Sequence, residues 1–246
     1  MFETIAQGVH RIEDAHVNWY LVEDGDGLTV VDSGLPRSWG SLQSALARLG
    51  RTLGHIDAVV LTHGHFDHVG FADRVRRELG VRIWAPEGER HVVAHPWDYD
   101  HEKPRIEYLL RHPRFDLIFL QMGLMGALWV KGVEGIVAYA PGQTLDVPGR
   151  PQAIDTAGHT YGHCSLLLAD RGVLLAGDAV VTFDPYIAQT GPQTVSRAAT
   201  ADSVRALASL DAIAATGAQI VATGHGPVWR EGAAAIAEQA RAASVT

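Results

Sequence analysis

Four side chains that commonly bind metal ions stand within six positions of this sequence. They belong to the hexad His63-Gly64-His65-Phe66-Asp67-His68, which closely follows a nearly continuous apolar run at residues 56–61. Such a run is typical of a strand that is covered on both faces. Imidazole and carboxylate groups suit zinc, iron or manganese. The hexad therefore predicts a metal-binding loop at the end of a buried strand, and the alternative is a polar turn whose histidines face water.

Three further candidates occupy the same kind of position later in the chain. His159 follows a predicted strand at 153–155, Asp178 follows an apolar run at 173–175, and His225 follows a predicted strand at 219–222. A catalytic metal needs ligands from several parts of a chain, because one short loop cannot surround an ion. Each candidate alone could cap a turn or be a histidine satisfied by the scaffold. Four repeats of one placement favour a shared metal site.

The order of predicted elements indicates an α/β fold. Strand-like runs at 18–22 and 28–31 flank a turn rich in Gly and Asp. A helix is expected at 38–49, the buried strand at 56–61, a second helix at 69–79 and another strand at 81–84. Strand signals return at 153–155, 165–168 and 173–175, and the chain closes with a helix at 202–214, a strand at 219–222 and a helix at 232–243. This alternation predicts helices layered on sheets.

Between these two parts, residues 91–141 lose the alternation and predict an inserted, mainly helical segment. Its stretch from 97 to 130 holds more apolar side chains than a surface connection needs, among them Phe119 and Met122. They could complete the core, form a dimer contact or build an apolar wall over the substrate.

Composition limits the classes of protein that this chain can be. Its 246 residues, 47% of them hydrophobic, are enough for one domain spanning 1–246 with a substantial core. The net charge of -8 disfavours a nucleic-acid partner and leaves a small-molecule substrate. The single cysteine, the polar N-terminal residues and the lack of a long apolar stretch predict a cytoplasmic protein without a membrane segment. The sequence is also compatible with a homodimer.

At these positions the sequence closely resembles the metallo-β-lactamase fold superfamily. The hexad has that family's His-x-His-x-Asp-His form, and Thr156-Ala157-Gly158-His159 is similar to its Thr-Pro-Gly-His, with Ala157 in place of proline. Gly177-Asp178 matches its bridging aspartate, and Gly224-His225-Gly226 matches its last histidine. The order of the motifs agrees over nearly the whole chain, including an early turn at Asp32. The resemblance implies a four-layer αββα sandwich with the metals at one edge.

The resemblance also implies how the ligands divide between two divalent ions, most simply Zn²⁺, with Fe or Mn as alternatives. The first ion would take His63, His65 and His159, the second would take Asp67, His68 and His225, and Asp178 would bridge them. Two such ions lower the pKa of a shared water, so that hydroxide serves as the nucleophile. Asp67 is in addition a candidate catalytic residue for proton transfer. His163 and Asp32 are expected to orient ligands.

This site predicts a metal-dependent hydrolase that attacks the carbonyl of an ester, lactone or thioester. Two alternatives keep the same fold, namely a persulfide dioxygenase-like oxidoreductase with a single non-haem iron and a phosphodiesterase. The complete second ligand set favours two metals and hydrolysis, and the acidic balance of charge disfavours a nuclease. An aspartate at position 178 is similar to the glyoxalase II and lactonase types, whereas family members that destroy β-lactams typically have cysteine or serine there.

Overall fold

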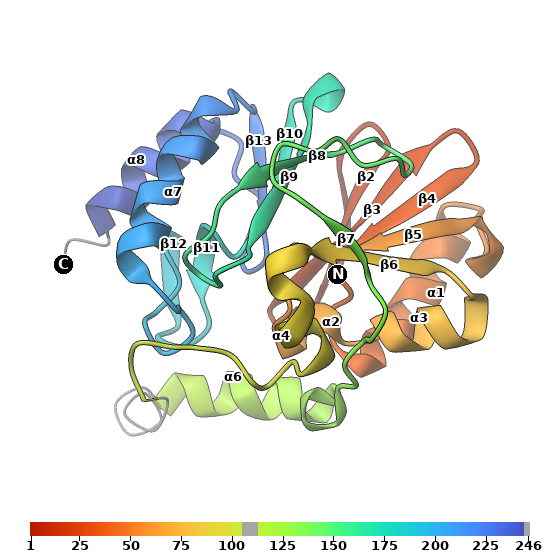
Figure 1. Cartoon of the computed structure of the whole chain (residues 1–246), viewed down its shortest axis with the longest axis horizontal. Helices are drawn as coiled ribbons and strands as arrows, with labels where there is room; N and C mark the ends of the chain where they lie inside the picture. Colours follow the sequence, from red (N-terminus) through yellow and green to blue (C-terminus); the bar gives the residue numbers. More distant parts are fainter. Residues whose placement is uncertain (105–112, 244–246) are drawn as a thin grey trace.

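Two β-sheets lie face to face in the middle of the molecule, and helices cover their outer surfaces (Figure 1). The computed structural model describes residues 1–104 and 113–243, with side chains from residue 116 onward in the second range. The order of layers is helix, sheet, sheet, helix, which confirms the αββα architecture.

The first sheet contains seven strands in chain order, antiparallel up to β4 and parallel from there on. They are β1 (Phe2–Ala6), β2 (Val9–Asp14), β3 (Val17–Asp24), β4 (Gly27–Val31), β5 (Ile56–Val60), β6 (Arg82–Pro86) and β7 (Val137–Tyr139). The predicted hairpin is β3 and β4, and the buried strand that precedes the hexad is β5.

The second sheet has four strands in the order β13-β10-β9-β8, and a separate hairpin follows β10 in the chain. The four are β8 (Gln152–Asp155), β9 (Cys164–Leu168), β10 (Val173–Gly177) and β13 (Ile220–Thr223), and the hairpin is β11 (Val181–Asp184) with β12 (Gln189–Gln193). Because β10 and β13 run parallel, their carboxyl ends meet at one edge of the sheet.

Helices flank both sheets. They are α1 (Trp39–Arg48), α2 (Phe66–Val69), α3 (Ala72–Leu79), α4 (Arg90–Ala94), α6 (Pro113–Leu124), α7 (Ser203–Ala215) and α8 (Ala233–Ala243). Short 3-10 helices are η1 (Pro36–Ser38), η2 (Leu53–His55), η3 (Glu87–Glu89), η4 (Ala127–Trp129) and η5 (Ala169–Arg171). In the part of the chain that the structure describes, no helix has the length and apolarity needed to cross a membrane.

Side chains alternate between the layers along each central strand. In β3, Trp19 and Leu21 join the core beneath α1 and α3, whereas Tyr20 and Val22 join the core between the sheets. In β10, Leu174 faces α7 and α8, and Leu175 faces the other sheet. This period of two explains why the strands that build both cores are apolar almost throughout.

The helix expected at 69–79 is divided in two. The last three residues of the hexad and Val69 form α2, and α3 begins only at Ala72, after a break at Gly70 and Phe71. The Gly70 N–H donates to Gly34 O, and a Cβ at this position would overlap the backbone of Leu35. Close backbone packing therefore interrupts the helix.

The inserted segment differs in part from the expectation of a mainly helical element. It contains α4 and α6, but its last residues form β7, which pairs with β6 at the edge of the first sheet. Ile118 and Met122 of α6 are buried against Leu35 and Phe66, so this helix completes a core next to the hexad. The residues 105–112 of the segment lie outside the described residues.

Candidate metal centre

The seven predicted ligands meet at the seam between the two sheets. His63, His65, Asp67 and His68 lie between β5 and the end of α2, and His159 lies in the loop from β8 to β9. Asp178 directly follows β10, and His225 lies just beyond β13. All seven are buried, the most exposed being Asp67 at 7%. The structure thus brings together every ligand that the sequence predicted, from both halves of the chain.

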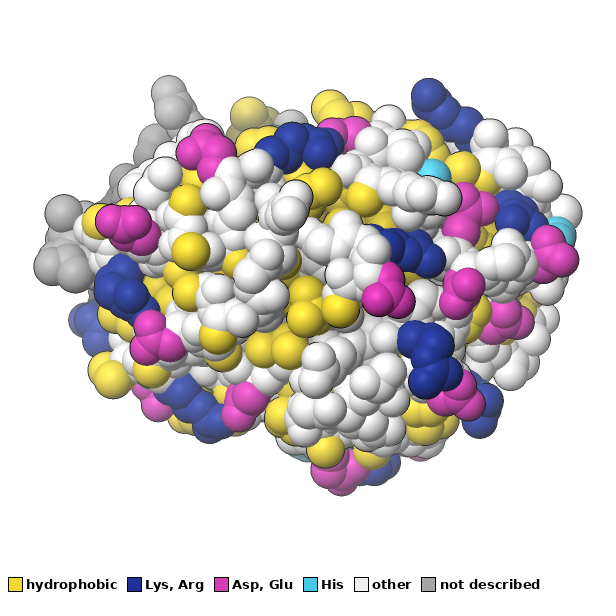
Figure 2. Space-filling model, turned by 90° about the horizontal axis from the view of Figure 1, so that it is seen from above, with side chains coloured by type: hydrophobic (Ala, Val, Ile, Leu, Met, Phe, Trp, Pro, Cys, Tyr) yellow, Lys and Arg dark blue, Asp and Glu magenta, His cyan; other side chains and the backbone are white. Residues whose placement is uncertain are grey.

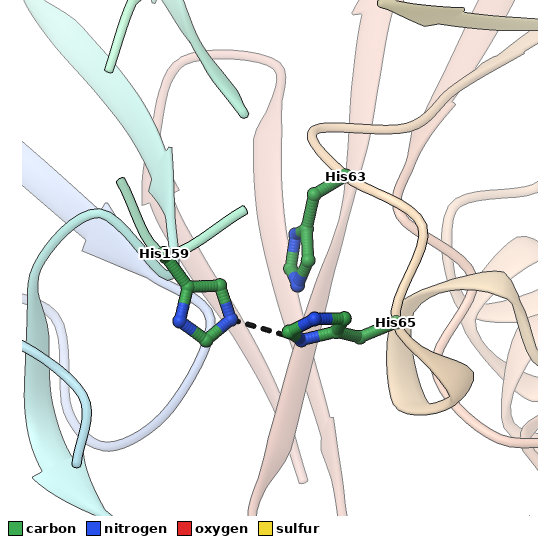
Figure 3. A group of neighbouring side chains, drawn as sticks. All are labelled: His63, His65 and His159. Atoms are coloured by element: carbon green, nitrogen blue, oxygen red, sulfur yellow. Dashed lines mark hydrogen bonds between the residues drawn. The ribbon is translucent and has the colours of Figure 1, made fainter. Parts of the chain in front are cut away.

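The ligand atoms form three overlapping groups. His63, His65 and His159 form the first (Figure 3), and their ligand atoms lie within 4.8 Å of one another. The same limit holds for a second group, Asp67 with His68 and His225, and for a third, His63 with His68 and Asp178. The first two groups consist of the residues that the resemblance assigns to the first and second ion sites.

Asp178 lies between these two groups of side chains. Its Oδ1 is 3.6 Å from His68 Nε2, and its Oδ2 is 3.2 Å from His225 Nε2 and 3.5 Å from His159 Nε2. Gly224 makes this approach feasible, because a Cβ there would overlap the Asp178 carboxylate and lie 2.9 Å from His68 Cε1. A carboxylate placed in this way can serve both sites.

The hydrogen bonding of the potential ligand atoms is consistent with bound divalent cations. Buried polar atoms in a native protein normally have hydrogen-bond partners. Five buried atoms of the predicted ligands have none, namely His63 Nε2, His65 Nε2, His68 Nε2, His159 Nδ1 and Asp178 Oδ1. His65 and His159 turn their other ring nitrogens towards each other, with His65 Nδ1 2.9 Å from His159 Nε2. The unpartnered atoms that metal coordination at the centre would satisfy are therefore those of His63, His68 and Asp178.

The second ring nitrogens of three histidines are held by the protein. His68 Nδ1 lies 3.0 Å from Asp32 Oδ2, His225 Nδ1 lies 2.7 Å from His16 O, and His63 Nδ1 lies 3.0 Å from Thr62 Oγ1. Each contact leaves Nε2 to face the centre, the arrangement by which proteins orient histidine ligands. Asp32 also accepts from the Thr62 N–H, in agreement with its predicted orienting role.

The histidines of the site fall into two classes according to the direction in which their pKa values are shifted. Burial and neighbouring histidines hold the pKa of His63 well below its ordinary value. Burial also lowers the pKa of His159, to about 3. Burial alone would lower the pKa of His68, but the carboxylates of Asp178, Asp67 and Asp32 raise it to about 9. The carboxylates thus make the electrostatic potential at the second group negative, which favours a cation there.

His163 fixes the backbone of the bridging aspartate. Its Nε2 accepts from the Asp178 N–H at 3.1 Å, so the ring hydrogen lies on Nδ1 and is donated to Thr156 Oγ1 at 2.8 Å. Burial lowers the pKa of His163 to about 3, which keeps the ring neutral. His163 therefore orients a ligand, as the sequence suggested, and Cys164 is a buried residue of β9.

The sequence interpretation missed Asn18 and Tyr99. Asn18 Nδ2 donates to Thr223 O and Gly226 O, which fixes the loop that carries His225. A polar residue within the apolar run at 18–22 was the available signal. The Tyr99 ring packs against His65 at 3.8 Å between centroids and lines a cavity of about 210 Å³ together with Tyr161. Through Tyr99, this cavity lies next to His65.

Comparison with known proteins supports the geometry. Residues 12–225 match the family model described as the metallo-beta-lactamase superfamily. The probable metallo-hydrolase YflN of Bacillus subtilis is 29% identical over 189 residues, covering 73% of this chain and 66% of that protein. A hydroxyacylglutathione hydrolase of Methylococcus capsulatus is 28% identical over 169 residues, covering 69% and 49%. The chain thus spans less than two thirds of the length of these relatives.

Among solved structures, a metallo-beta-lactamase family protein from Thermus thermophilus superimposes with a TM-score of 0.70 at 25% identity. The superposition covers 98% of this chain and 80% of that one. The architecture is therefore that of an established fold.

Proposed function

Because the chain belongs to the metallo-beta-lactamase superfamily, we propose that it is a dinuclear metal-dependent hydrolase acting on an ester, lactone or thioester of a small molecule. One observation carries the proposal. The buried Asp178 carboxylate lies between two groups of potential ligands, and its Oδ1 and the Nε2 atoms of His63 and His68 have no hydrogen-bond partner. A carboxylate is the ligand that two adjacent cations can share.

We expect each ion to be held by three protein side chains and by the shared aspartate. Imidazole and carboxylate donors suit zinc, and a site of this kind leaves a coordination position open for water or substrate. When bound, the ions supply a water of lowered pKa and a Lewis acid that polarises the carbonyl oxygen.

The side chains of the protein hold and move protons around this centre. Burial raises the pKa of Asp67, but the positive charge of His68 and His225 outweighs burial and lowers it. An ionised Asp67, with Oδ2 3.4 Å from His225 Nε2, can accept a proton from the attacking water and return it to the leaving group. We propose Asp67 for this role in addition to metal binding.

The surroundings of the site favour a small carbonyl substrate. The adjoining cavity of about 210 Å³ is lined partly by Tyr99 and Tyr161, which offer aromatic surface to a compact group. The name of the Methylococcus relative denotes hydrolysis of a thioester. On the face shown in Figure 2, the described Lys and Arg side chains are interspersed with Asp and Glu and form no continuous basic stripe. This distribution does not favour a nucleic-acid substrate.

The test is metal analysis followed by an activity screen. We expect about two zinc-like ions per chain and metal-dependent hydrolysis of at least one ester, lactone or thioester in a panel that also contains phosphodiesters and β-lactams. His63→Ala and His225→Ala should each lower the metal content. A single iron with no hydrolysis would instead indicate the oxidoreductase, and activity confined to phosphodiesters would refute the proposed carbonyl substrate.

A further inference from the structure

Glu89 is a buried acidic residue that the proposed mechanism does not use. It ends η3, directly after β6, and is only 1% exposed. Among the described residues, no Lys or Arg forms an ion pair with it. A buried charge without a basic partner costs several kcal/mol, so a folded protein keeps one only where other groups stabilise it.

The two oxygens of Glu89 contact two different metal-binding loops. Oε2 accepts from the Gly64 N–H at 2.9 Å, and Gly64 lies between His63 and His65. Oε1 accepts from the Gly162 N–H at 2.8 Å, three residues after His159. One carboxylate therefore joins the loop of the first sheet to the loop of the second.

Glycines allow the backbones to approach this carboxylate closely. A Cβ at Gly162 would lie 2.7 Å from Glu89 Oε1 and 2.6 Å from Gly88 C, and a Cβ at Gly64 would lie 2.6 Å from Val93 N. All three distances are shorter than real Cβ contacts. The segment from Gly88 to Val93 is thus packed directly against both loops.

The histidines brought together by this bridge are those of the first ion site. His63, His65 and His159 are neutral ligands, so this group adds no negative charge of its own to balance a dication. A carboxylate hydrogen-bonded to the backbone on either side of them would supply part of that balance at short range.

We propose that Glu89 is a positioning residue, whose carboxylate sets the distance between the His63–His65 loop and the His159 loop and thereby determines the affinity of the three-histidine site. This inference rests on the proposed metal centre. Residues that orient ligands typically change metal affinity by 10- to 100-fold when replaced.

The experiment measures metal binding to the full chain rather than hydrolysis. Metal-free wild type, Glu89→Gln and Glu89→Asp are titrated with Co²⁺, followed by visible absorption, and with Zn²⁺ in competition with a chromophoric chelator. Gln keeps the size but replaces one acceptor oxygen by an amide that faces an N–H donor. Asp keeps the charge on a shorter side chain. Glu87→Gln is the control, because Glu87 is exposed and pairs with Arg90.

We expect one of the two equivalents to bind about 10- to 100-fold more weakly in Glu89→Gln, with an altered cobalt spectrum, a smaller loss in Glu89→Asp and no change in Glu87→Gln. Wild-type constants and spectra in Glu89→Gln would overturn the inference, even if its melting temperature fell. Should Glu89→Gln fail to fold, wild-type binding by Glu89→Asp would overturn it. Wild type that binds two ions without hydrolysing any carbonyl substrate would refute the proposed reaction and leave the Glu89 comparison decisive.

Discussion

Gly224→Ala should disable the metal centre without altering any ligand. A Cβ on Gly224 would overlap Asp178 Oδ1 and lie 2.9 Å from His68 Cε1, whereas ordinary contact begins at 3.4 Å. His68 would have to retreat by about 0.5 Å and the Asp178 carboxylate by more. Both side chains are buried, so neither can move into solvent. Displacements of about 1 Å at a reacting centre can cost about 10²-fold in rate.

We therefore expect Gly224→Ala to lower kcat/KM by about 10²-fold and to weaken metal binding, while overpacking lowers the free energy of unfolding by about 1–3 kcal/mol. Kinetics, metal counting and urea unfolding would measure the three effects. Gly40→Ala is the matched control, because a Cβ there meets no atom within 4 Å and the helix α1 should gain up to about 1 kcal/mol. Two tightly bound metals and wild-type kcat/KM in Gly224→Ala would refute the close packing of Asp178 on Gly224.

Three further changes have distinct expected outcomes. Asp178→Asn should weaken metal binding by about 10³-fold, because a unit charge about 4 Å away contributes about 4 kcal/mol at an effective dielectric constant of about 20. Undiminished metal content after dialysis would exclude the bridging role. Met122→Ala should lower the free energy of unfolding by about 2–5 kcal/mol, whereas Leu120→Ala, at an exposed position of the same helix, should change it by less than about 0.5 kcal/mol. Equal effects would place Met122 outside the core. The pKa of His163 is about 3 in the folded chain, against an ordinary value of 6.5. As the pH falls from 6.5 towards 3, the unfolded chain therefore takes up a proton that the folded chain does not, and the free energy of unfolding decreases. This loss amounts to roughly 3 kcal/mol at pH 4.5. Urea unfolding of the metal-free proteins should show this loss in wild type and not in His163→Gln. An identical pH dependence in the two proteins would contradict the expected role of His163.

The position of the site could be predicted from sequence because its signals are local. An apolar run followed within a few residues by His or Asp recurs at four places, and each run became a strand, namely β5, β8, β10 and β13. The parallel pairing of β10 with β13 then brings Asp178 and His225 to one edge. The first step needed only local patterns, whereas the pairing of β10 with β13 is a long-range contact that the structure supplies.

Other elements were not predicted because their stabilising contacts are distant in sequence. The strands β1 and β2 carry charged residues that alternation rules place in solvent, yet Arg11 is buried, with ion pairs to Glu3 and Glu13. β7 has only three residues and lies in a segment of mixed composition. In both cases, tertiary pairing outweighs local propensity.

The residues around the ligands were the hardest to foresee, since what they do depends on which loops come together. Nothing near Glu89 in the sequence indicates that it reaches both Gly64 and Gly162. Asn18 belongs to the first sheet but holds the loop of His225, which follows the second. Both residues cross the seam on which the ions would sit. Neither sheet holds a complete first ion site, because His63 and His65 come from one half and His159 from the other. The affinity of that site for a metal should therefore depend on the polar groups that hold the two halves together at the seam, which the Glu89→Gln titration tests.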